Sequence, residues 1–192
     1  MTILVTGSAG FIGSNFVNNW FLSNEEEVLS VDALTYAGNL ANLKSQENNA
    51  NHHFVNADIS DKSKIKALVD QYKPRAIIHF AAESHVDRSI LASDAFIKTN
   101  ILGTYNLLEI CREYQSNFDI KFIHISTDEV FGSLGEGDDG FNEDTSYKPN
   151  SPYSATKAAS DHLVRAWHHT YNLQTLITNC SNNYGPYQFP EK

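Results

Sequence analysis

The chain has 192 residues, a formal net charge of −9 and an apolar fraction of 41%. This length is enough for one domain with a full hydrophobic core, and the acidic balance argues against non-specific binding to nucleic acid or to an anionic membrane surface, because both need a basic patch. The two cysteines, Cys111 and Cys180, have no metal-like spacing, and there is no basic leader and no apolar run near the ~18 residues of a membrane span. We therefore expect a cytoplasmic protein with free thiols, no metal and no membrane segment.

Short runs rich in β-branched residues alternate along the chain with longer stretches of helical periodicity. The expected strands cover residues 2–6, 28–32, 53–58, 76–82, 122–127 and 175–180. The expected helices cover residues 11–22, 61–72, 94–114 and 151–171. Several strands are apolar on both faces, as in a parallel sheet that is covered by helices on both sides. The pattern therefore predicts a doubly wound α/β fold.

The first expected strand leads into "TGSAGFIG", which places Gly7, Gly10 and Gly13 in a GxxGxxG spacing ahead of a helix. Glycines in this context let the backbone turn sharply and approach a pyrophosphate, which then lies on the helix N-terminus. Asp32 ends the second strand, where a carboxylate can accept hydrogen bonds from an adenosine ribose. A carboxylate there repels a 2′-phosphate, and the following "ALTY" has no Arg or Lys. The pattern predicts a site for NAD rather than NADP.

A Tyr–Lys pair occurs in "YSATK", which places Tyr153 and Lys157 on one face of the expected fourth helix. An ammonium near a phenol stabilises the phenolate and lowers the pKa of the tyrosine from about 10. Such a phenolate can take a proton from a sugar hydroxyl while hydride leaves the same carbon. The pair therefore indicates an oxidation step next to the dinucleotide.

Together, the glycine loop, Asp32 and the Tyr–Lys pair resemble the extended short-chain dehydrogenase/reductase superfamily, whose members work largely on nucleotide sugars with tightly held NAD. Within it, the Thr-Asp-Glu of "ISTDEVFG" is similar to the nucleoside-diphosphate-sugar 4,6-dehydratases. Four longer stretches, "VDALTYAGN", "AAESHVDRSI", "SPYSATKAASDHLVRAW" and "TNCSNNYGPYQFPEK", closely resemble the dTDP-glucose 4,6-dehydratase family. The resemblance covers the chain from Met1. It implies a Rossmann-like fold and a lyase that converts dTDP-glucose to dTDP-4-keto-6-deoxyglucose.

The resemblance assigns a role to each member of a catalytic set. After C4 is oxidised with NAD, Glu129 would remove the proton from C5, and a protonated Asp128 would donate to the departing C6 hydroxyl before hydride returns to C6. Two adjacent carboxylates that cannot both ionise easily supply one acid and one base. Thr127 would hydrogen-bond the C4 oxygen beside Tyr153, and Lys157 completes the set.

The resemblance also implies a set of contacts to the cofactor and the substrate. The expected cofactor contacts are Gly7, Gly10, Phe11, Ile12, Gly13, Asp32, Ala33, Leu34, Thr35, Asp58, Ile59, Ala81, Ala82, Ser84, Thr99, Tyr153, Lys157 and Asn183. The expected substrate contacts are Ser84, Thr127 and Asn182. Family members pair through helices that correspond to 94–114 and 151–171, so we expect a homodimer.

The family's chain continues well beyond the final "FPEK", into the part that holds most of the nucleoside diphosphate. We therefore expect residues 1–180 to form the NAD-binding domain and 181–192 to begin a substrate domain that is largely missing, so that this chain binds NAD but turns over weakly or not at all. Three alternatives stay open: a UDP-glucose 4,6-dehydratase, a nucleotide-sugar epimerase and a non-catalytic NAD-binding module. Asp128 and Glu129 argue against the epimerase, and the complete acid–base set argues against the module.

Overall fold

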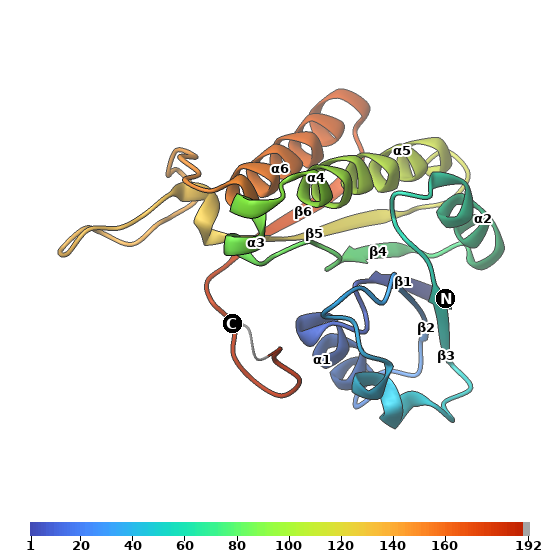
Figure 1. Ribbon diagram of the computed structural model, residues 1–192. Helices are drawn as coiled ribbons and strands as arrows, with labels where there is room; N and C mark the ends of the chain where they lie inside the picture. The colour runs from blue at the N-terminus through green and yellow to red at the C-terminus, as the bar shows by residue number, and fades with distance from the viewer. Residues whose placement is uncertain (190–192) are drawn as a thin grey trace.

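Six parallel strands form one sheet in the order β3-β2-β1-β4-β5-β6. The computed structural model describes residues 1–189 (Figure 1). The strands are β1 (Thr2–Thr6), β2 (Glu27–Asp32), β3 (His52–Asn56), β4 (Ala76–His79), β5 (Lys121–Thr127) and β6 (Gln174–Cys180). The doubly wound parallel sheet predicted from the alternation of strands and helices is confirmed.

Helices cover both faces of the sheet (Figure 1). They are α1 (Phe11–Trp20), η1 (Leu40–Gln46), α2 (Lys62–Tyr72), α3 (Val86–Leu91), α4 (Asp94–Phe96), η2 (Ile97–Gly103), α5 (Thr104–Tyr114), η3 (Asp128–Phe131) and α6 (Pro152–Tyr171). The alternation of side chains along β1 divides the core in two. Leu4 packs into the cluster formed with α2, α5 and α6, whereas Ile3 and Val5 pack into the cluster formed with α1 and η1. Burial on both faces explains why this strand is apolar throughout.

The expected helix over 94–114 is continuous but not uniform. Its middle part, η2, is a π-helical turn between α4 and α5. The Asn100 carbonyl accepts hydrogen bonds from the hydroxyls of Thr104 and Ser160, each at 2.6 Å. Side-chain donors thus occupy a backbone acceptor and widen the turn. The periodicity predicted the helix but carried no sign of the π-helical turn.

Helix α6 begins as its sequence predicted. Ser151 is the N-cap, Pro152 lies in the first turn, and the Ser151 and Ser154 side chains form a reciprocal capping box. The loop 132–151 ahead of it, yellow to orange in Figure 1, extends away from the sheet. Within residues 1–189, no helix combines the length and the apolar character that are needed to cross a bilayer.

Three short helices and two strand ends differ from expectation. Helices η1, α3 and η3 were not predicted, because segments of this length show little periodicity. β4 was expected to reach residue 82 but ends at His79, where its partner β1 also ends at Thr6. β3 ends at Asn56 rather than at 58, since its register with β2 stops at Asp32. Residues 190–192 of the predicted substrate-binding region lie outside the described residues.

Candidate active site

A cavity of about 760 Å³ opens at the carboxyl ends of the strands. The strand order reverses between β1 and β4, so the loops after these two strands run in opposite directions and leave a crevice between them. The segment after β6 returns across this edge toward α1, where Asn15 donates a hydrogen bond to the Pro186 carbonyl at 2.8 Å (Figure 1). Crevices at this position are where open α/β sheets bind ligands.

The glycine loop fits a ligand that comes close to the backbone. Gly7 has φ of +66°, and a Cβ on it would lie 2.5 Å from the Ala81 nitrogen. A Cβ on Gly13 would lie 2.1 Å from the Gly7 carbonyl oxygen. The N-cap of α1 is Gly10, with no side-chain hydrogen bond to the first turn, and Phe11 and Ile12 line the cavity. Because no side chain caps the first turn of α1, its N-terminal N–H groups are available to a phosphate in the cavity.

Asp32 is buried at the end of β2 and holds the glycine loop. Its Oδ2 accepts from the Ala9 nitrogen at 2.9 Å, and its Oδ1 accepts from the Leu34 nitrogen at 2.7 Å. Burial raises the pKa of the Asp32 carboxyl, and these hydrogen bonds oppose the increase. A carboxylate has about four acceptor positions, so Asp32 keeps capacity for a ribose hydroxyl. The loop and this carboxylate together fit the adenosine diphosphate part of a dinucleotide.

Most of the predicted site residues meet in this one cavity. Its lining includes Gly7, Gly10, Phe11, Ile12, Gly13, Asp32, Ala33, Thr35, Asp58, Ile59, Ala81, Ala82, Ser84, Thr99, Thr127, Glu129, Tyr153, Asn182 and Asn183. Three predicted residues, Leu34, Asp128 and Lys157, are not part of the lining. Leu34 contributes through its N–H to Asp32 instead.

Thr127, Asp128 and Glu129 form the junction between β5 and η3. Thr127 is the N-cap of η3, and its Oγ1 accepts a hydrogen bond from the Glu129 nitrogen at 3.2 Å. The same hydroxyl lies 3.4 Å from Oδ1 of Asp128. Glu129 therefore faces the cavity together with Thr127 and Tyr153, whereas Asp128 lies against the Thr127 hydroxyl.

The environment of Tyr153 differs from the expectation. Tyr153 is only 7% exposed, and burial followed by the charge of Glu129 raises the pKa of its phenol. The Lys157 ammonium donates to the Ile125 carbonyl at 2.8 Å. The prediction that Lys157 lowers the pKa of Tyr153 is therefore wrong for this structure, because burial and the nearby carboxylates raise that pKa.

One contact and one buried residue near the site were not predicted. The Arg88 guanidinium lies 3.8 Å from the ring centroid of Tyr36, which joins α3 to the loop after β2. Asp161 lies one helical turn after Lys157, almost fully buried. Its spacing of four from Lys157 was visible in "KAASD", but its partners come from other parts of the chain. Among residues 1–189, no three His, Cys, Asp or Glu side chains are grouped as ligands for a metal ion.

The sequence similarity to named relatives extends over the whole of this chain. It is 57% identical to the dTDP-glucose 4,6-dehydratase of Xanthomonas campestris pv. campestris (strain B100) over 197 residues, with 100% of this chain and 56% of the relative covered. It is 52% identical to the dTDP-glucose 4,6-dehydratase of Salmonella typhimurium, covering 57% of that protein. The chain thus spans little more than half the length of the curated relatives it matches.

Solved structures agree with this similarity. DesIV, a dTDP-glucose 4,6-dehydratase from Streptomyces venezuelae with NAD and TYD bound, has a TM-score of 0.93 and 45% identity, with 100% of this chain and 59% of that chain covered. A UDP-glucose 4-epimerase from Thermus thermophilus in complex with NAD has a TM-score of 0.88 and 33% identity, with 99% and 58% covered. The model of one family, described as GDP-mannose 4,6 dehydratase, matches residues 4–192. Since this match takes in nearly every residue, the chain belongs to that family.

Proposed function

We propose that the protein containing this chain is an NAD-dependent dTDP-glucose 4,6-dehydratase, and that residues 1–189 carry its cofactor site and its acid–base groups. The observation that carries the proposal is the meeting of Thr127, Glu129 and Tyr153 in the same cavity as the glycine loop. The names of the relatives at 52% and 57% identity support the substrate. The NAD in the DesIV structure supports the cofactor.

When bound, NAD would accept a hydride from C4 of the sugar, return one at C6, and in its oxidised form bring a positive charge into the cavity. Tyr153 would take the proton of the C4 hydroxyl, which Thr127 orients. Because burial and Glu129 raise the pKa of Tyr153, this proton transfer depends on that added positive charge.

The two carboxylates would divide the elimination of water. A ketone at C4 acidifies the hydrogen on C5, so Glu129 would remove this proton as the base and later return one to C5. Asp128 would protonate the departing C6 hydroxyl, a role that requires its carboxyl to leave the Thr127 hydroxyl. The net change is loss of one water: the hydride returns at C6 and Glu129 returns its proton to C5, while Tyr153 releases the C4 hydroxyl proton to solvent and Asp128 takes one up from solvent, which restores both groups. General acid–base catalysis of this kind contributes about 10²–10⁴-fold to a rate.

The cofactor part of the proposal is tested on this chain by isothermal titration calorimetry. We expect NAD to bind at least ~10-fold more tightly than NADP, because the Asp32 carboxylate repels a 2′-phosphate. Asp32→Asn should narrow the difference between the affinities for NAD and NADP. Asp119→Asn, in an exposed position away from the cavity, is the matched control and should leave that difference unchanged. Equal affinity for the two cofactors in the parent chain would contradict the assignment.

The reaction is tested by mass spectrometry of nucleotide sugars incubated with the whole protein and NAD. A 4,6-dehydratase removes one water from dTDP-glucose, whereas an epimerase leaves the mass unchanged and a binding module leaves the sugar intact. Loss of water from UDP-glucose in preference to dTDP-glucose would transfer the assignment to a UDP-glucose 4,6-dehydratase.

A homodimer through the continuous helix 94–114, which comprises α4, η2 and α5, and through α6 is also part of the proposal. Exposed apolar side chains support it, among them Ile97 at 46%, Leu102 at 51% and Tyr105 at 39% exposure. We expect Leu102→Glu to convert the dimer to a monomer in sedimentation equilibrium, because a charge would be buried at the interface. Leu22→Glu, at a side chain 82% exposed in the turn after α1, should leave the dimer intact. A parent protein that sediments as a monomer would contradict the proposal.

Both cysteines are free, which supports a location in a reducing compartment such as the cytoplasm.

A further inference from the structure

Asp161 continues the row that Tyr153 and Lys157 begin on α6. The three residues follow one another at a spacing of four, so they lie on one face of the helix. This face is directed at the carboxyl ends of β5 and β6, and Lys157 and Asp161 are 3% and 2% exposed. The dehydration chemistry outlined above uses Tyr153 and gives Asp161 no role.

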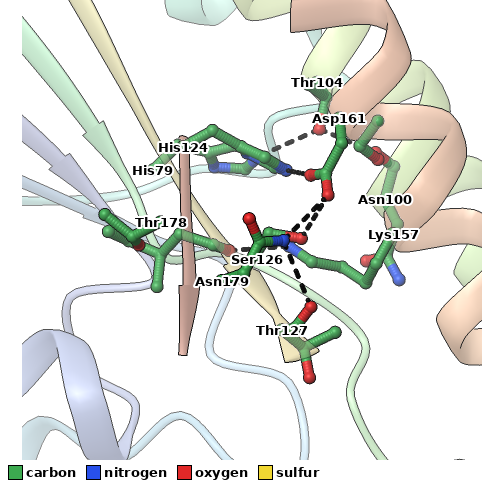
Figure 2. Close-up of polar contacts among 12 residues, drawn as sticks. His79, Asn100, Thr104, His124, Ser126, Thr127, Lys157, Asp161, Thr178 and Asn179 are labelled. Atoms are coloured by element: carbon green, nitrogen blue, oxygen red, sulfur yellow. Dashed lines mark hydrogen bonds and ion pairs between the residues drawn. The ribbon is translucent and has the colours of Figure 1, made fainter. Parts of the chain in front are cut away.

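The Asp161 carboxylate accepts hydrogen bonds from three separate segments, two of which, at Ser126 on β5 and Asn179 on β6, are labelled in Figure 2. Its Oδ2 accepts from the Ser126 hydroxyl at 2.8 Å and from the Tyr147 hydroxyl at 2.9 Å. The Asn179 amide donates to the same oxygen at 3.3 Å and also to the Thr127 carbonyl at 3.3 Å. One carboxylate thus holds the last residues of β5 and β6 against α6, directly behind the cavity.

The Lys157 ammonium lies in the same buried region and has few groups to balance its charge. The ionisable groups that face it are His79 on β4, His124 on β5, Cys180 on β6 and Asp161 on its own helix. Burial lowers the pKa of His124 to about 4 and that of His79 well below its usual value, so neither histidine is charged at neutral pH. His124 Nε2 lies 3.3 Å from Asp161 Oδ1, the oxygen that does not meet the three donors.

We propose that Asp161 is a positioning residue, whose buried carboxylate orients the Ser126–Thr127 end of β5 and supplies the counter-charge of the Lys157 ammonium. Burial lowers the pKa of Lys157 to about 8, and Asp161 opposes that decrease. Burial also opposes ionisation of Asp161, but hydrogen bonding and the charge of Lys157 favour the carboxylate, and the pKa of Asp161 lies below its ordinary value. The inference rests on the proposed function only in that Lys157 belongs to the expected catalytic set.

The test is an NMR titration of this chain labelled with ¹³C and ¹⁵N in its lysines, where Lys157→Arg identifies the Lys157 signal. We expect Asp161→Asn to lower the titration midpoint of Lys157 by about 1–2 pH units, because the substitution removes an opposite charge and keeps an acceptor oxygen. Asp161→Glu should stay near the parent value. Tyr147→Phe is the matched control, because it removes one hydrogen bond to the same carboxylate without a change of charge.

An unchanged midpoint in a folded Asp161→Asn chain would overturn the proposal, as would an equal shift in Tyr147→Phe. If Asp161→Asn does not fold, the ¹³C carboxyl signal of Asp161 in the parent decides. The proposal requires it to be ionised at neutral pH and to change again at the Lys157 midpoint, and a protonated or insensitive carboxyl contradicts it. A parent chain that fails to bind NAD would overturn the proposed function but leave these midpoints unaffected, so the two failures are distinguishable.

Discussion

Glu129→Gln is expected to reduce the turnover of dTDP-glucose by the whole protein about 10³-fold while NAD binding stays within a factor of two or so of the parent. The amide keeps the shape of the side chain but cannot accept the C5 proton. Since Glu129 lines the cavity beside Tyr153 and raises the pKa of that phenol, its removal also lowers the pKa of Tyr153. The loss should therefore lie in the elimination and not in the oxidation at C4.

This division can be measured by rapid mixing. The fast appearance of NADH without loss of water would show that oxidation proceeds and elimination does not. Glu136→Gln, in the exposed loop 132–151, removes a charge of the same kind away from the cavity and should leave turnover unchanged. If Glu129→Gln keeps the parent rate, Glu129 is not the base of the elimination.

Gly7→Ala is expected to lower the free energy of unfolding by about 3 kcal/mol or more and to prevent NAD binding. Alanine at φ of +66° is strained, and its Cβ would lie 2.5 Å from the Ala81 nitrogen, which is backbone and cannot move aside cheaply. Relief of this contact would separate the loops after β1 and β4, which form the crevice. Urea unfolding and calorimetry measure the two effects.

Gly137→Ala is the matched control for this change. Gly137 also has positive φ, at +88°, but no heavy atom lies within 4 Å of its added Cβ. Only the backbone penalty of about 1–2 kcal/mol is then expected, with NAD binding intact. Equal losses of stability at Gly7 and Gly137 would show that the close approach to Ala81 is of no consequence.

The predictable part of this site follows from the geometry of parallel sheets. Gly7, Asp32 and Thr127 lie far apart in the chain, yet each lies at or just after the end of a strand, and these ends share one edge of the sheet. Knowing the strands was therefore enough to bring these residues together. The same logic placed Tyr153 nearby, because α6 begins after the loop that leaves this edge.

What the sequence did not reveal depends on contacts between distant segments. Asp161 accepts hydrogen bonds from Ser126, 35 residues earlier, and from Asn179, 18 residues later. No local sequence pattern predicts partners at such distances along the chain. The pKa of Tyr153 depends on burial and on the positions of carboxylates, so a Tyr–Lys spacing alone gave the wrong sign. The π-helical turn at Asn100 arises from hydroxyls that compete for one carbonyl.

The hydrogen bonds of Asp32 have a consequence for cofactor engineering. A designer who wishes to switch such an enzyme to NADP would first remove the acidic residue at this position. Here the same carboxylate also accepts hydrogen bonds from the backbone N–H groups of Ala9 and Leu34, so the proposed determinant of cofactor preference also holds the glycine loop in place. A switch of preference would require a second substitution that restores these two acceptors. In evolution as in the laboratory, the path to the other cofactor therefore passes through a less stable protein.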